Sequence, residues 1–151
     1  MEFRDLIDRR QSVRNYSDEE VEGGKVEEIL EAARTAPSAG NLKAYDIEVV
    51  REEDKKEELS LAARGQDHVR EASVDLVFFQ DRERSGRKYG DRGRDLYSLQ
   101  DATIAAAYAQ LAATDLGIAN CWVGAFDEEG VSEITGNQLR PVAVITLGYS
   151  D

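Results

Sequence analysis

Cysteine and histidine are almost absent from this chain, and each shortage excludes a class of site. Cys121 is the single cysteine, which excludes an intrachain disulfide and a cysteine metal cluster. His68 is the single histidine, which excludes a histidine-rich metal site. We expect His68 on the surface because its neighbours are polar, and Cys121 in the core because it lies in an apolar strand pattern.

The sequence also lacks the short motifs of common catalytic and nucleotide-binding sites. It contains no G-x-S-x-G elbow, no H-E-x-x-H, no Walker loop and no G-x-G-x-x-G. We therefore predict no metal ligand and no obvious catalytic side chain. Any redox or transfer chemistry has to come from a bound cofactor.

Positive charge is scarce as well. Lysine and arginine number 19 against 31 aspartates and glutamates, so the formal net charge is −12. This argues against binding to nucleic acid or to an anionic membrane, since both need a basic face. An acidic, lysine-poor surface fits a salt-adapted protein, and a biased genome composition produces the same pattern.

Length and hydrophobicity predict one globular domain over residues 1–151, because 41% of the residues are hydrophobic. The N-terminus carries no apolar signal segment, and no hydrophobic run approaches membrane-spanning length. We therefore expect a cytoplasmic protein with no membrane partner.

Helical and strand patterns alternate along the chain, which indicates an α/β or α+β class with a small sheet covered by helices. The helix at 96–116 is apolar around most of its circumference, so we expect it to be buried within the domain or against a partner. Residues 80–95 are charged and punctuated by glycine, so we predict a loop there. The other helices are expected at 2–9, 25–34, 52–63 and 128–134, and the strands at 45–50, 72–79, 118–123 and 141–147.

The stretch RRQSVRNY (residues 9–16) concentrates positive charge in an otherwise acidic protein. Arg10, Ser12 and Arg14 alternate, so in an extended segment their side chains share one face. Two guanidinium groups and a hydroxyl on one face suit a phosphate, because arginine donates paired hydrogen bonds to phosphate oxygens. The alternative is a solvated turn whose arginines pair with the protein's many carboxylates.

Two further segments have a composition that suits a flat ligand. PSAGN (37–41) combines small residues with a serine and an asparagine, which allows close backbone approach and offers hydrogen bonds. CWVGAFD (121–127) is a strand that runs into a small-residue pair, so its backbone N–H groups can face an electron-rich edge. Taken singly, each segment is explained better as an ordinary connection between elements.

Together and in this order, these segments resemble the nitroreductase family of FMN-binding flavoproteins. The resemblance implies an α+β fold in three layers, with a small mixed central sheet flanked by helices. It also implies a homodimer that holds two FMN molecules at the subunit interface. The similar segments, with a gap over residues 51–87, are RRQSVRNY, APSAGNLKAYDIEVV, GRDLYSLQDATIAAAYAQLAATDLGI, CWVGAFDEEGVSEI and PVAVITLGY.

The resemblance also assigns roles to individual residues. The RRQSVRNY stretch, the basic segment, would contact the FMN phosphate and ribityl chain. The PSAGN turn of the partner subunit would line the pocket of the flavin ring. Gly124 and Ala125, after the third strand, would lie beside the ring. Backbone donors there stabilise the negative charge that the flavin gains on reduction. The residues implied are Arg10, Gln11, Ser12, Arg14, Pro37, Ser38, Asn41, Lys43, Gly124 and Ala125.

The sequence departs from the family pattern after the PSAGN turn. Where members often have glutamine, proline and tryptophan, this chain has Lys43, Ala44 and Tyr45. Our hypothesis is that Lys43 places a cation near the flavin and makes the reduced anionic ring easier to hold. An unchanged flavin midpoint potential in a Lys43→Gln variant would contradict it.

Two longer features of the family are also missing from this sequence. Larger members carry a helical insertion over the active site, for which we expect no room between Phe79 and Leu96. The family pattern continues past LGY to a basic residue that grips the phosphate and to a tail that embraces the partner, whereas this sequence ends at Asp151. The sequence is therefore either that of a compact variant with a weakened phosphate site or incomplete.

The resemblance implies an oxidoreductase that works by a ping-pong mechanism. NADH or NADPH would pass a hydride to FMN and leave, and an electron-poor small molecule (a nitroaromatic, a quinone or an enone) would then accept the electrons. Tyr45, Tyr89 and Phe126 either wall the acceptor pocket or belong to the core. The alternatives are a non-catalytic flavin-binding or redox-sensing protein of the same fold, and a helical interaction module that binds no flavin.

Overall fold

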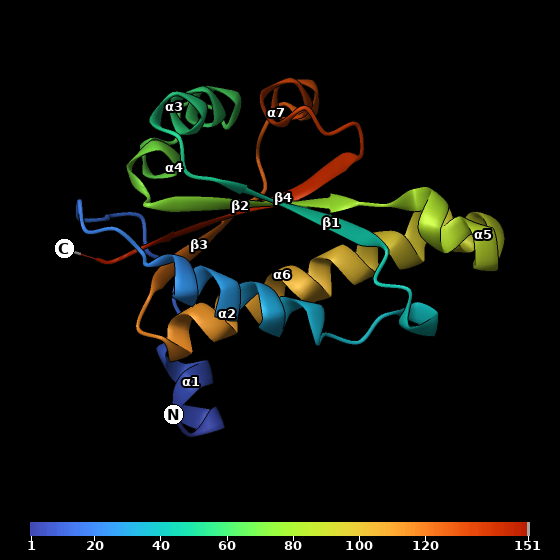
Figure 1. Cartoon of the computed structure of the whole chain (residues 1–151), viewed down its shortest axis with the longest axis horizontal. Helices are drawn as coiled ribbons and strands as arrows, with labels where there is room; N and C mark the ends of the chain where they lie inside the picture. The colour runs from blue at the N-terminus through green and yellow to red at the C-terminus, as the bar shows by residue number, and fades with distance from the viewer. Residues whose placement is uncertain (151) are drawn as a thin grey trace.

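The computed structural model describes residues 1–150 and shows a sheet between two layers of helices (Figure 1). The strands are β1 (Tyr45–Val50), β2 (Val74–Gln80), β3 (Ala119–Val123) and β4 (Arg140–Gly148). The helices are α1 (Phe3–Arg9), α2 (Gly23–Arg34), α3 (Glu53–Ala62), α4 (Asp67–Glu71), α5 (Arg82–Arg92), α6 (Ser98–Asp115) and α7 (Glu128–Thr135), with a 3₁₀ turn η1 (Ala39–Asn41) and a π-helical turn η2 (Gly93–Tyr97).

The sheet has the strand order β1-β2-β4-β3, and each neighbouring pair is antiparallel. Helices and antiparallel strands in separate layers make this an α+β fold, as the sequence resemblance implies. Among the described residues, the parallel pairing that a mixed sheet requires is confined to a single bridge between Ser12 and Asn120.

Strand β2 is buried along its whole length because helices cover both faces of the sheet (Figure 1). Val74, Leu76 and Phe78 join the core on the face covered by α2 and α6. Val77 and Phe79 join a second core on the opposite face, with residues of α3, α4 and α7. This alternation places neighbouring β2 side chains in different cores.

Helix α6 is buried on one face only. Its alanines at 102, 105, 106, 109 and 113 pack inside the domain, which confirms part of the expectation for this helix. Ile104 is 36% exposed and Tyr108 is 38% exposed on another side of the helix. Helix α6 therefore has a second apolar face, which the domain itself does not cover.

The helix and strand patterns of the sequence are confirmed apart from small shifts at the element ends. In α2 the buried positions are Val26, Ile29, Leu30 and Ala33, which is the spacing of one helical face. Helix α3 is rich in charged residues, but Lys56, Leu59 and Ser60 are buried. One face of α3 covers the sheet, so this helix is amphipathic.

The prediction of a loop over residues 80–95 is wrong, because α5 and η2 occupy this segment. Asp81 starts α5 by accepting a hydrogen bond from the backbone N–H of Arg84 at 3.1 Å. A Cβ added at Gly93 would lie 2.6 Å from the backbone oxygen of Ser85, so glycine allows α5 and η2 to pack closely. Gly86 and Gly93, two of the glycines that suggested a loop, are packing positions, whereas Gly90 has a positive φ of 65° at a kink in α5.

His68 is also a correction, since it is only 6% exposed and lies in α4 instead of on the surface. The expectation for Cys121 is confirmed, because this thiol is buried. Within residues 1–150, none of the helices has the length together with the apolar character that crossing a bilayer requires.

Candidate functional site

The basic segment (residues 9–16) lies along β3. Ser12 forms the parallel bridge to Asn120, and the N–H of Val13 donates to the Asn120 carbonyl at 3.0 Å. Asn120 is buried, and its side chain is bonded to Gln110 of α6 at 3.1 Å. The backbone of the segment is thus anchored to the core, while the side chains of Ser12 and Arg14 are exposed.

The cations of this segment are not neutralised by the protein. Among residues 1–150, neither Arg10 nor Arg14 has a carboxylate oxygen within 4.0 Å. The protein carries a net charge of −12, so carboxylates were available as partners. Unpaired guanidinium groups on an anchored backbone favour an anion site over a solvated turn with internal ion pairs.

Gly124 and Ala125 follow the other end of β3, and both are exposed. The Ala125 carbonyl accepts a hydrogen bond from the side-chain amide of Gln66 at 3.4 Å. Four residues of strand separate Asn120 from Gly124, a distance of roughly 13 Å. Strand β3 therefore carries the basic segment near its start and the small-residue pair at its end.

His68 of α4 lies near enough to Arg14 for the charge of Arg14 to affect it. Its Nε2 is 3.4 Å from Oε1 of Gln66, and its Nδ1 has no partner among residues 1–150. Burial, followed by the positive charge of Arg14, lowers the pKa of His68. The imidazole is therefore neutral at pH 7 and does not compete with Arg14 for an anion.

The PSAGN turn is strained and held in place by side chains. Gly40, Asn41 and Lys43 have positive φ angles of 62°, 58° and 49°, a conformation that non-glycine residues rarely adopt. The Ser38 hydroxyl accepts from the N–H of Lys43 at 3.0 Å. The buried carboxylate of Asp101 in α6 accepts from the backbone N–H groups of residues 39 and 44, each at 3.2 Å.

Within one chain, the two predicted halves of the site lie far apart. Asp101 of α6 holds the PSAGN turn, and Gln110 of the same helix holds Asn120 beside the basic segment. Nine residues of helix separate these two anchors, which corresponds to about 14 Å. Figure 1 shows the same separation, with η1 beyond one end of α2 and the N-terminal segment beyond the other. In a single chain Arg10, Gln11, Ser12, Arg14, Gly124 and Ala125 therefore lie along β3 or directly after it, and Pro37, Ser38, Asn41 and Lys43 lie in or just after the turn that Asp101 holds.

The three aromatic residues considered for an acceptor pocket have different environments. Tyr45 belongs to the core under α2 and α6, and Phe126 packs against the core on the other face of the sheet. Tyr89 instead lies beside the PSAGN turn, where its hydroxyl would be 2.5 Å from a Cβ at Gly40. Of the three, Tyr89 is the one that adjoins a predicted site segment.

Sequence reasoning missed the residues that hold these segments in place. Asp101 is the one acid of an alanine-rich helix before its last residue, Asp115, and that isolation was a usable signal of a buried role. Asn120 shows no such signal, because asparagine in a short strand is unremarkable until its partner on α6 is known. Arg84 donates to the Lys43 carbonyl at 3.0 Å from a segment that was predicted to be a loop.

A prominent hollow on the surface lies elsewhere. It measures about 840 Å³ and is bordered by α7 together with the segments around Arg82 and Arg140. None of the ten predicted cofactor residues borders it. A site shared between two chains is open in each of them, so the anchored, unpaired cations locate it better than the size of a hollow in one chain.

Comparison with known proteins decides the family. The sequence profile of the nitroreductase family matches residues 7–66 and 59–149. The chain belongs to the nitroreductase family. It is 32% identical over 170 residues to an NADH dehydrogenase of Thermus thermophilus, an alignment that covers 93% of this chain and 83% of that protein.

Two further relatives carry FMN in their names. The FMN reductase (NADPH) of Bacillus subtilis is 25% identical over 160 residues, which cover 96% of this chain and 64% of that protein. The structure of an FMN-dependent nitroreductase from Clostridium difficile R20291 superposes with a TM-score of 0.82 at 28% identity and covers 97% of this chain and 86% of that one. The nitroreductase family fold thus extends over nearly the whole chain.

Proposed function

We propose that this chain is an FMN-dependent oxidoreductase that uses NADH or NADPH as its electron donor. Membership of the nitroreductase family and the FMN-related names of its relatives support this assignment. The observation that carries it is that Arg10 and Arg14, which have no carboxylate partner, lie in a segment anchored to β3. Exposed small residues lie at the far end of the same strand.

The residues present fit FMN by their chemistry. Arg10 and Arg14, with Ser12 between them, offer the donors that a phosphate and a polyol chain require, and Gln11 adds a backbone contact. Gly124 and Ala125 offer exposed backbone at the end of β3, where a flat ring system can approach closely. FMN supplies the hydride chemistry when bound, and the protein supplies binding, orientation and electrostatics.

The site requires a second copy of the chain, so we propose a homodimer. Within one chain Pro37, Ser38, Asn41 and Lys43 lie by the Asp101 end of α6, whereas Arg10 and Arg14 lie by the Gln110 end, and we assign the first group to the cofactor of the partner. Exposed apolar side chains mark the surface for this contact. Phe3 and Ile7 on α1 are 65% and 48% exposed, and Ile104 and Tyr108 of α6 are exposed as well. Such a surface is typical of a protein interface.

The donor and the acceptor bind in turn to the same open side of the cofactor, which gives ping-pong kinetics. The acceptor is a small electron-poor molecule such as a nitroaromatic, a quinone or an enone. We assign no acid or base for the reaction to the side chains of the proposed site. Their role is to position the cofactor, the donor and the acceptor and to balance charge.

The test is an absorbance spectrum after incubation with excess FMN and desalting, followed by NADH and NADPH oxidation with a quinone acceptor. We expect about one FMN per chain and turnover with at least one donor. Arg14→Gln removes a charge-assisted contact, so it weakens FMN binding roughly ten- to a hundredfold. Arg140→Gln, an exposed arginine paired with Glu128, is the matched control and leaves FMN binding unchanged.

The other outcomes separate the rival functions. Protein that retains FMN but oxidises neither donor is a flavin-binding or redox-sensing protein. Protein that stays colourless in excess FMN contradicts the proposed function.

A further inference from the structure

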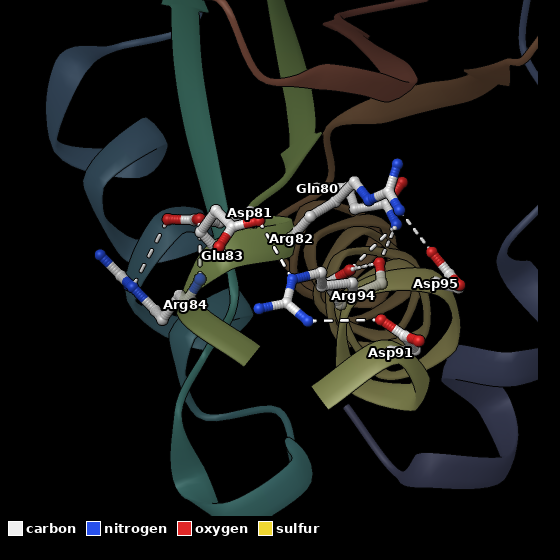
Figure 2. Close-up of polar contacts among 9 residues, drawn as sticks. Gln80, Asp81, Arg82, Glu83, Arg84, Asp91, Arg94 and Asp95 are labelled. Carbon is white, nitrogen blue, oxygen red and sulfur yellow. Dashed lines mark hydrogen bonds and ion pairs between the residues drawn. The ribbon is translucent and has the colours of Figure 1, made fainter. Parts of the chain in front are cut away.

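Helix α5 and the turn η2 carry cations of two kinds, and the first kind is neutralised. Figure 2 shows Arg82 paired with Asp95, Arg84 with Asp81, and Arg94 with its carboxylate partners. The Arg84 pair measures 3.6 Å, and Arg94 lies 3.2 Å from Glu83 and 3.4 Å from Asp91. These arginines hold the segment together and are not available to a ligand.

The second kind has no carboxylate partner. Within residues 1–150, Arg87, Lys88 and Arg92 have no carboxylate oxygen within 4.0 Å, and of these three Lys88 and Arg92 lie over tyrosine rings. Lys88 Nζ is 5.4 Å from the centroid of Tyr89, and Arg92 Cζ is 5.6 Å from that of Tyr97. The two rings pack edge to face at 5.2 Å, which joins the four side chains into one cation–tyrosine cluster.

The cation–tyrosine cluster adjoins the PSAGN turn. A Cβ built on Gly40 would lie 2.5 Å from the Tyr89 hydroxyl and 3.0 Å from Lys88 Nζ. Arg84 of the same helix donates to the carbonyl of Lys43 in this turn. Helix α5 therefore supports a strained turn and places Lys88 next to it, with Arg92 joined to Lys88 through the two tyrosine rings.

Charge and shape together define the ligand that suits the cluster. In a protein with a net charge of −12, a polyanionic ligand is repelled by most of the surface and is attracted where cations are unpaired. Aromatic rings beside those cations offer a flat apolar surface. A nicotinamide dinucleotide has both properties, because it carries phosphoryl groups and flat rings.

We propose that Lys88 and Arg92 bind a phosphoryl group of the nicotinamide donor, and that Tyr89 and Tyr97 form the surface beneath it. This inference rests on the proposed function, in which the PSAGN turn lines the ring of the cofactor. The cluster makes α5 a determinant of donor affinity and leaves the chemistry to the cofactor. The phosphoryl group belongs either to the diphosphate that both donors share or to the 2′-phosphate that only NADPH carries.

The test compares kcat and KM for NADH and NADPH in FMN-loaded protein carrying Lys88→Gln or Arg92→Gln. Two variants are matched controls. Lys55→Gln removes an exposed lysine of α3 that pairs with Glu52 at 3.8 Å, and Arg87→Gln removes an α5 cation outside the cluster. We expect KM of the donor to rise roughly tenfold in each cluster variant, with kcat and the KM of the acceptor within about twofold of wild type.

The pattern across donors identifies the phosphoryl group. A rise in KM for NADPH alone assigns it to the 2′-phosphate, and an equal rise for both donors assigns it to the diphosphate. Unchanged KM values for both donors would overturn the inference, as would an equal rise in Arg87→Gln, which would indicate a general effect of charge. A cluster variant that loses FMN is replaced by Lys88→Arg, which keeps the charge and has to retain a low KM.

Failure of the underlying function has a separate signature. Wild-type protein that holds no FMN, or that oxidises neither donor, overturns the proposed function itself. Wild-type turnover with an unaffected donor KM in the cluster variants overturns only the role of the cluster.

Discussion

Asp75 lies near the start of β2 with no exposed surface, and both of its carboxylate oxygens lack a hydrogen-bond partner among residues 1–150. Its cross-strand neighbour is Thr146, whose hydroxyl is bonded to that of Tyr16 at 2.6 Å. Burial raises the pKa of Asp75 well above its ordinary value of 3.8, and the charge of Lys56 opposes this shift. Asp75 therefore keeps its proton to a higher pH in the folded protein than in the unfolded chain.

The consequence is a loss of stability as pH rises. Above the ordinary pKa the folded state binds more protons at Asp75 than the unfolded state, so the free energy of unfolding falls with pH until the folded-state pKa is passed. Asp75→Asn mimics the protonated side chain and removes this dependence. We expect its stability advantage over wild type to be larger at about pH 8 than at about pH 5.

Urea unfolding of both proteins across this pH range measures the effect. Asp18→Asn, at an exposed position, is the control and leaves the pH dependence as in wild type. Parallel curves for Asp75→Asn and wild type would contradict the protonated state of Asp75.

Helix α5 differs from the other elements because tertiary contacts decide its structure. Periodic apolar residues predicted α2, and alternating or continuous apolar runs predicted the strands, because burial of those residues is what holds the elements in place. Residues 82–92 have no such pattern, and their glycines and charges are typical of a loop. Close packing at Gly86 and Gly93 and a set of ion pairs stabilise the helix instead.

Glycine substitutions test this explanation. Gly93→Ala places a Cβ 2.6 Å from the backbone oxygen of Ser85, which cannot move freely, so we expect a loss of about 1–3 kcal/mol. At Gly86 the nearest group is the flexible side chain of Arg94 at 2.5 Å, and its displacement costs less than about 1 kcal/mol. Gly24→Ala in α2 meets open space and should gain about 0.5–1 kcal/mol.

Free energies of unfolding in urea, compared at equal m-values, check this order of effects. A Gly93→Ala variant as stable as wild type would show that α5 and η2 do not pack as described.

The same contrast explains what the sequence predicted of the site. The basic segment, the PSAGN turn and the small residues after β3 were identified because their composition is unusual and their order resembles a family. Their supports, Asp101 and Asn120, act through contacts between segments far apart in the chain, and such contacts have no local pattern. The burial of His68 was missed for the same reason, since polar neighbours in the sequence do not reveal the helix that covers the side chain.

At the scale of the whole molecule, α6 fixes the positions of the two halves of the proposed site. Its two polar anchors hold the PSAGN turn and the basic segment about 14 Å apart, and its exposed Ile104 and Tyr108 add to the apolar surface of α1. In the proposed two-fold dimer, the turn of one chain would meet the basic segment of the other, which would produce two equal sites. The proposed site therefore requires that each cofactor is held by two chains.

Mixing two defective variants measures this most directly. Arg10→Glu reverses a charge in the phosphate half, and Asn41→Trp fills the ring half at an exposed position, so each alone should bind little FMN. After equal mixing and subunit exchange, half of the dimers carry one variant of each kind, and each of these has one intact site. We predict recovery of about a quarter of the wild-type FMN binding.

A control shows that exchange has taken place, since differently tagged copies of the two variants then co-purify. If mixed dimers form and FMN binding does not recover, each site lies within one chain, and the shared site proposed here is contradicted.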